Sequence, residues 1–195
     1  SADLTVSSNN GEGGGGSIGV TAGGDITMAS SGSGNIVLQA DGNKSSDNYA
    51  GDGGYVQFIA SGDITVSSTV RMRANGAKPD GAGGMVELTA GGDLSIAGQL
   101  NALGKGSDGM GGDIDLAAGG DIVVSGSAGI DATGKGGAGT IGLLATDAIA
   151  FSGEADASAE GSGLGGAVSV RAGTTLDLSG DLIVDGSPSS DSNGT

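Results

Sequence analysis

The sequence predicts an all-β fold, a parallel β-helix (β-solenoid), from three observations. One phrase recurs as AGGDITMAS, ASGDITVSS, AGGDLSIAG and AGGDIVVSG, beginning at Ala22, Ala60, Ala90 and Ala118. Apolar residues alternate with polar ones in short runs, which is the period of a β-strand. Glycine accounts for 45 of the 195 residues, without the every-third spacing and abundant proline of collagen.

Each repeat is expected to hold three strands. Residues 83–110 read GGMVELTAGGDLSIAGQLNALGKGSDGM. The apolar residues of this unit fall in three alternating runs: Val86, Leu88 and Ala90; Leu94 and Ile96; Leu100 and Ala102. No segment has the 3.6-residue spacing of an amphipathic helix, and the glycine-rich breaks are too short to form one.

The units align along the chain. Their first apolar residues are 38, 30, 28, 27 and 27 residues apart, which fits one turn of three strands. Three columns of inward side chains are therefore expected. The first holds Ile18, Val56, Val86, Ile114, Ile141 and Val168; the second Ile26, Ile64, Leu94, Ile122, Ile149 and Leu176; the third Ile36, Val70, Leu100, Ile130, Ala155 and Leu182.

The chain is predicted to be a single β-solenoid domain, residues 1–195. Its turns have 27–30 residues, and one turn carries a longer insertion at 43–53. Three parts are expected: a lone strand (Leu4, Val6) with a glycine-rich loop at 1–16, six stacked turns at 17–186, and a polar tail at 187–195. Solenoids normally end in caps, and none is recognisable, so we expect a segment of a longer protein.

The net charge limits the classes of binding partner that are expected. The net charge is −16, with 23 acidic residues against seven basic ones, and histidine, cysteine and tryptophan are absent. Nucleic acid and anionic membrane surfaces need a basic patch, so neither is an expected partner. No apolar run reaches the roughly 20 residues of a membrane-spanning helix, so no membrane insertion is expected. Without cysteine, disulfide scaffolds and thiolate metal sites are excluded.

The repeated phrase also places aspartates in one column. Its members are Asp25, Asp63, Asp93 and Asp121. One interpretation is a corner, in which the glycines adopt positive φ and the carboxylate accepts backbone N–H bonds in an Asx-turn. The alternative is a structural calcium site, because Ca²⁺ prefers carboxylate and carbonyl oxygens. Ala148 and Thr175 replace the aspartate in the last two turns, which favours the corner interpretation. No cofactor is predicted, and the four aspartates are kept as candidate calcium ligands.

The loops between turns form a second charged set. They carry Asp47, Asp52, Asp80 and Asp108, with Lys44, Lys78, Lys105 and Lys135 near the start of each loop. A solvated edge of offsetting charge is the expected result, and a ligand or cation groove along this edge is the alternative.

Catalysis is not expected. Histidine is absent, the aromatic residues are only two Tyr and two Phe, and regular turns offer no place where acids of different environment converge. No catalytic and no cofactor-binding residue is therefore predicted, and the protein is expected not to be an enzyme.

The units GGSIGVTAGGDITMAS, GGMVELTAGGDLSIAG and GGDIDLAAGGDIVVSG resemble the glycine-rich repeats of large bacterial surface exoproteins, the filamentous-haemagglutinin-like adhesins. The resemblance covers nearly the whole chain and lies in the style of the repeat. It implies a right-handed β-helix, secretion to the bacterial cell surface, and a passive stalk that holds binding domains away from the cell.

The expected function is therefore a structural, non-catalytic shaft of an extracellular bacterial adhesin or surface fibre. The expected partners are flanking repeats of the same polypeptide or identical subunits, with a host-surface or glycan ligand as a further option. Two alternatives stay open. One is a self-assembling filament subunit that stacks head to tail. The other is a calcium-dependent or glycan-binding module.

Overall fold

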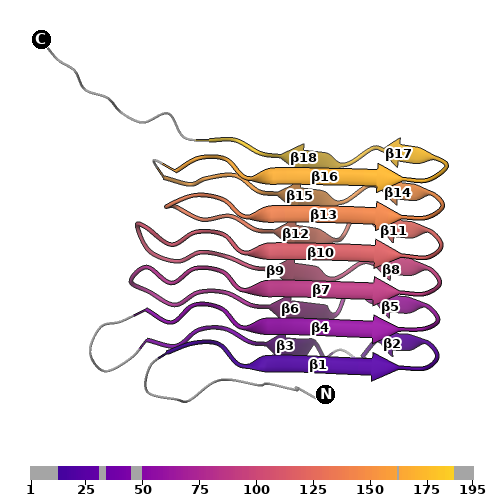
Figure 1. The fold of residues 1–195 in the computed structure, drawn as a ribbon, viewed down its shortest axis with the longest axis horizontal. Helices are drawn as coiled ribbons and strands as arrows, with labels where there is room; N and C mark the ends of the chain where they lie inside the picture. Colours follow the sequence, from indigo (N-terminus) through magenta and orange to yellow (C-terminus); the bar gives the residue numbers. More distant parts are fainter. Residues whose placement is uncertain (1–12, 31–33, 45–49, 162, 187–195) are drawn as a thin grey trace, which may run out of the picture.

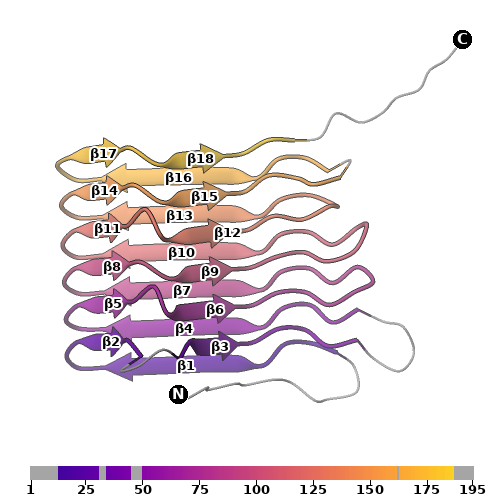
Figure 2. The same cartoon turned by 180° about the vertical axis from the view of Figure 1, so that it is seen from behind.

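The computed structural model describes residues 13–30, 34–44, 50–161 and 163–186. These residues form eighteen β-strands in three parallel sheets of six strands each (Figures 1 and 2). No helix occurs in the described ranges, so none of them contains a helix long and apolar enough to cross a membrane. The all-β parallel solenoid predicted from the sequence is confirmed.

The three sheets take their strands in rotation. Sheet A contains β1 (Ser17–Ala22), β4 (Tyr55–Ala60), β7 (Met85–Ala90), β10 (Asp113–Ala118), β13 (Thr140–Ala145) and β16 (Ala167–Ala172). Sheet B contains β2 (Ile26–Met28), β5 (Ile64–Val66), β8 (Leu94–Ile96), β11 (Ile122–Val124), β14 (Ile149–Phe151) and β17 (Leu176–Leu178). Sheet C contains β3 (Ile36–Gln39), β6 (Val70–Arg73), β9 (Gln99–Asn101), β12 (Gly129–Asp131), β15 (Glu154–Asp156) and β18 (Asp181–Ile183).

The coil is right-handed. In Figure 1 the strands of sheet A run from left to right across the front, and the chain returns behind them through sheets B and C. It then rises by one strand and re-enters sheet A. Figure 2 shows the returning strands from behind, with β2 and β3 at the bottom and β17 and β18 at the top.

Alternation of side chains along each strand builds the core. In β7, Val86, Leu88 and Ala90 are buried, and the residues between them are half-buried on the outer face. Val86 pairs with Val56 below and Ile114 above, so equivalent positions stack into aliphatic columns. Parallel strands lie about 4.8 Å apart, which brings the stacked side chains into contact. The first and second predicted columns are confirmed by these pairings along sheets A and B.

The third predicted column is wrong at its first two members. In the structure Leu100 pairs with Met72, and Met72 pairs with Leu38, so Ile36 and Val70 lie one inward position too early. The column comprises Leu38, Met72, Leu100, Ile130, Ala155 and Leu182. The cause is the spacing between inward residues of the two sheets: five residues separate Val66 from Met72, and only three separate Ile96 from Leu100. A difference of two residues preserves the inward and outward alternation, so the pattern cannot reveal it.

The predicted role of the corner glycines is also wrong. Among the described glycines only Gly13 and Gly106 have positive φ, and neither lies in the repeated phrase. At several corners glycine lies too close to the turn below for a side chain, although Ser61 and Thr146 occupy the equivalent position in other turns. A methyl carbon added at Gly91 would lie 2.3 Å from the carbonyl oxygen of Ser61 in the turn below.

The two ends of the stack differ in burial. At the first turn Ile18, Met28 and Leu38 are buried. At the last turn the inward residues of β17 are 45% (Leu176) and 44% (Leu178) exposed. The β16–β18 turn therefore presents an apolar surface of the kind that every other turn buries. The lone strand predicted at Leu4 and Val6, and the polar tail at 187–195, lie outside the described residues.

Candidate functional site

The aspartates of the repeated phrase lie between sheets A and B, where each carboxylate binds the next turn. The Oδ1 atom of each accepts a hydrogen bond from the backbone N–H one turn later. The donors and N···O distances are Asp63 to Asp25 at 2.9 Å, Asp93 to Asp63 at 2.8 Å, Asp121 to Asp93 at 2.8 Å, and Ala148 to Asp121 at 2.8 Å. The corner interpretation correctly predicted backbone N–H donors. It was wrong about the turn that supplies them, because it placed the donors in the aspartate's own turn and they belong to the next turn.

The glycine before each aspartate makes room for this bond. A methyl carbon at Gly92 would lie 2.1 Å from Oδ1 of Asp63, and one at Gly120 would lie 2.1 Å from Oδ1 of Asp93. The phrase Gly-Asp is therefore one device spread over two turns. The aspartate of one turn reaches toward the next, where Gly62, Gly92 or Gly120 leaves space for its carboxylate; above Asp121 the glycine position is taken by Asp147.

Calcium binding by these residues stays a prediction. The four carboxylates lie in a row along the stack, each with one oxygen engaged by a backbone N–H. Within the described part of the chain, no group of three or more His, Cys, Asp or Glu side chains is arranged to hold a metal ion.

Asp93 allows the corner role to be tested. We expect Asp93→Ala to lower the free energy of unfolding by about 1 kcal/mol, because the N–H of Asp121 loses its acceptor. Asp93→Asn keeps an oxygen at the same place and is expected to stay within about 0.5 kcal/mol of the parent. Urea unfolding followed by circular dichroism measures both. A thermal midpoint that rises with Ca²⁺ and falls with EDTA in the parent but not in Asp93→Asn would contradict the corner role and favour the calcium site.

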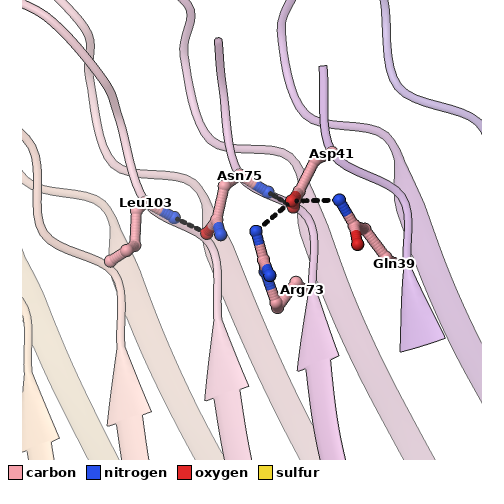
Figure 3. Close-up of polar contacts among 5 residues, drawn as sticks. All are labelled: Gln39, Asp41, Arg73, Asn75 and Leu103. Carbon is pink, nitrogen blue, oxygen red and sulfur yellow. Dashed lines mark hydrogen bonds and ion pairs between the residues drawn. The ribbon is translucent and has the colours of Figure 1, made fainter. Parts of the chain in front are cut away.

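A buried polar network occupies the corner after sheet C (Figure 3). Asp41 accepts hydrogen bonds from the Gln39 side-chain amide at 2.8 Å and from the backbone N–H of Asn75 at 2.9 Å, and it forms an ion pair with Arg73 at 2.5 Å. The Asn75 side chain then accepts the backbone N–H of Leu103 at 2.9 Å. Asp41 and Asn75 are both buried, so these bonds compensate the loss of water around them.

In later turns, an aspartate at this corner accepts a hydrogen bond from a backbone N–H of its own turn. The Asp131 carboxylate accepts the backbone N–H of Thr133 at 3.0 Å, and that of Asp156 accepts the backbone N–H of Ser158 at 2.9 Å. Burial raises the pKa of Asp131 above its usual range, while the hydrogen bond from Thr133 opposes that rise. Sheet C is therefore acidic at β12 and β15, whereas it carries arginines at β6.

A shallow groove lies on the outer face of sheet C, and we call it the β6–β9 groove. It has a volume of about 480 Å³ and is lined by Ser68, Arg71, Arg73, Asn75, Gln99, Asn101, Leu103 and Lys105. Arg71 lies beside Gln99, and Arg73 lies beside Asn101, in the parallel pairing of the two strands. The groove thus combines three cationic side chains with three carboxamides.

A second hollow lies over the loops that follow sheet C. It has a volume of about 670 Å³ and is lined by Lys44, Lys78, Pro79, Gly106, Ser107 and Lys135. Six of the seven basic residues of the chain line one or the other of these hollows. The sequence placed the four lysines on one edge, but it gave no indication that Arg71 and Arg73 lie beside Lys105.

The acidic residues of the same loops are bound to backbone. Asp52 accepts the N–H of Ala82 at 2.9 Å, and Asp80 accepts that of Ser107 at 2.9 Å. Backbone N–H donation from the next loop lowers the pKa of Asp80. Among the described residues the four loop lysines form no ion pair, so the loop acids do not neutralise them by direct contact. Asp47 lies outside the described residues.

The outer face of sheet A carries the opposite charge at β7 and β10. The Tyr55 hydroxyl and the Gln57 side-chain amide both donate to Glu87, and the bond to Glu87 raises the pKa of Tyr55 to about 12. Asp115 pairs directly with Glu87 on the next strand. Burial, then the neighbouring charges of Asp113 and Glu87, raise the pKa of Asp115. Glu87 is thus engaged in hydrogen bonds that hold it against the sheet.

The fold and these surfaces define the class of protein as a parallel β-solenoid with three strands per turn. Comparisons with protein-family models, curated proteins and solved structures found no match to the chain.

Proposed function

We propose that the chain is a structural, non-catalytic shaft segment of an extracellular bacterial surface protein. The observation that carries this proposal is the continuity of the three sheets, each of which pairs in register through all six strands. Equivalent core positions hold aliphatic, methionine or phenylalanine side chains from turn to turn. A stack of this kind gives stability through neighbouring turns and length through repetition, which suits a spacer.

The exposed last turn supports the same proposal. Leu176, Leu178 and Leu182 are inward residues that stay partly exposed, and no described strand lies above them. A further turn of the same design would bury these side chains and pair the free edges of β16, β17 and β18. The surface therefore suits continuation by flanking repeats.

The head-to-tail filament is the weaker candidate. Stacking requires apolar surface at both ends, and the first turn offers less than the last: Val20 is 36% exposed, but Ile18 is only 5% exposed and Met28 is also buried. Identical subunits would therefore meet with one open and one closed end. We expect the purified chain to be a monomer.

Sedimentation velocity and negative-stain electron microscopy test this expectation. A single monomeric species without fibres supports the shaft. Fibres that Leu178→Asp abolishes, and that the control Leu144→Asp on the outer face of sheet A leaves intact, would instead establish the filament subunit. Leu144 is a suitable control because it is also exposed, faces outward from sheet A and lies on β13, which is paired on both edges.

The cellular placement belongs to the same proposal. The glycine-rich repeats resemble those of secreted adhesins, and an acidic surface favours solubility outside the cell. Protease treatment of intact source cells tests the placement: loss of the protein from intact cells supports it, and protection until lysis contradicts it.

A further inference from the structure

Six of the seven basic residues of this acidic chain line two neighbouring hollows. Arg71, Arg73 and Lys105 line the β6–β9 groove, and three further lysines line the neighbouring hollow. Arg171, the remaining basic residue, lies on β16 and lines a different depression. In a chain of net charge −16, scattered cations would be expected to pair with the many carboxylates nearby, so their concentration in two neighbouring hollows indicates a binding surface.

The groove presents an ordered array of hydrogen-bonding groups. Arg71 and Arg73 are two residues apart on β6 and therefore point to the same face, about 7 Å apart along the strand. Gln99 and Asn101 are their direct partners on β9, about 4.8 Å away. Two guanidinium groups thus lie beside two carboxamides, and Lys105 follows in the adjoining loop.

One of the two arginines is fixed in place. Arg73 is held by its ion pair with Asp41, which is itself held by Gln39 and by the N–H of Asn75. This anchoring lowers the entropy lost when the guanidinium binds a ligand. Asp41 cancels one of the three positive charges, and Arg71 and Lys105 have no ion-pair partner among the described residues. The groove therefore keeps a net positive charge.

These groups select a ligand that carries both acidic groups and hydroxyls. Guanidinium groups bind carboxylate or sulfate with two parallel hydrogen bonds. Carboxamides donate and accept, which suits the hydroxyl groups of a sugar. The groove is open and has no aromatic residue among its lining, so it does not offer the stacking surface that a nucleobase uses.

From this array we infer that the β6–β9 groove binds an acidic oligosaccharide. Arg71 and Arg73 contact the acidic groups of the ligand, Gln99 and Asn101 contact its hydroxyls, and Lys105 adds charge at the loop end. The acidic residues on β12 and β15, Asp131, Glu154 and Asp156, limit the ligand on the C-terminal side by repulsion. This inference is independent of the shaft role, because a lateral groove needs only two turns of the stack.

Titration with hexagalacturonate, which has a carboxylate on every ring, tests the inference. The binding is measured by calorimetry and by amide chemical shifts in NMR spectra of the full chain. We expect saturable binding, with shifts concentrated in β6, β9 and the loop around Lys105. The variant with Arg71→Gln and Lys105→Gln is expected to weaken binding at least tenfold. Neither side chain takes part in the Asp41 network, so the fold should be retained.

Arg171→Gln is the matched control, because it also removes an exposed arginine from the outer face of a strand. It is expected to leave the affinity within twofold of the parent. Maltohexaose, a neutral ligand of equal length, is expected not to bind. The inference is overturned by an absence of saturable binding at millimolar hexagalacturonate, by an equal loss in Arg171→Gln, or by equal binding of maltohexaose or inorganic sulfate. If the double variant unfolds on thermal melting, Arg71→Gln alone decides the outcome.

Discussion

Leu100→Ala is expected to lower the free energy of unfolding by about 3 kcal/mol. Leu100 is fully buried and lies in the third core column between Met72 and Ile130. Removing its side chain leaves a cavity that the neighbouring turns cannot close, because the spacing of the turns is fixed by backbone hydrogen bonds in all three sheets. Urea unfolding followed by far-UV circular dichroism measures the loss.

Leu144→Ala provides the comparison for this prediction. Leu144 lies in β13 and is 51% exposed on the outer face of sheet A. The same change of side chain there is expected to cost less than about 0.5 kcal/mol, as for most surface substitutions. Equal losses for the two variants would show that the assigned inward face of sheet C is wrong.

Gly112→Ala is expected to destabilise the protein by about 3 kcal/mol or more, although it adds only one methyl group. That methyl carbon would lie 2.0 Å from the carbonyl oxygen of Gly84 and 2.6 Å from the carbonyl carbon of Gly83. Both atoms belong to the backbone of the turn below, so no side-chain rotation relieves the overlap. The two turns must separate locally, which weakens the pairing of β10 with β7.

Gly126→Ala is the control for this second prediction. Gly126 lies between β11 and β12, and a methyl carbon there would meet only the carbonyl oxygen of Ser152 at 3.5 Å, an ordinary contact. Its free energy of unfolding is expected to stay within about 0.5 kcal/mol of the parent. Thermal and urea unfolding of the two glycine variants measure the difference. A similar loss at both positions would mean that close approach to the turn below does not explain the cost of the substitution at Gly112.

Sheets A and B could be predicted almost completely from the sequence. The phrase around Asp93 fixes the corner between them, because strand alternation before and after it leaves only one alignment of the apolar residues. Val86 and Leu94 therefore fall in the columns that the strand pairing shows. The repeated phrase and the apolar–polar alternation along each strand were therefore sufficient to predict this part of the fold.

Sheet C could be predicted only in part. The number of residues between the last inward residue of sheet B and the stacked inward residue of sheet C changes by two between turns, and Val70 and Met72 are equally suitable inward residues for a strand. The register is decided by pairing with Leu100 on the neighbouring strand, which is a long-range contact that no single repeat contains. Sequence patterns within one turn hold no information about that choice.

The candidate sites show the same division. The aspartates were recognised as corner residues, but their acceptor role links two turns, as for Asp63 and the N–H of Asp93. The groove was missed because Arg71 and Lys105 are far apart in sequence and lie together only through the coiling of the chain. The spacing of Lys78 and Lys105 by nearly one repeat was the available signal for the lysines.

Each corner carboxylate binds the next turn toward the C-terminus, so these hydrogen bonds all run in one direction along the stack. The acceptor carboxylate of Asp25 precedes its donor, the backbone N–H of Asp63, in the chain. The carboxylate of Asp63 likewise precedes its donor, the N–H of Asp93. During synthesis, which proceeds from the N-terminus, each finished coil is thus a template already equipped to receive the one that emerges next. The same bonds leave the carboxylate acceptors of each turn on its C-terminal side, where the following turn of the chain supplies the donors.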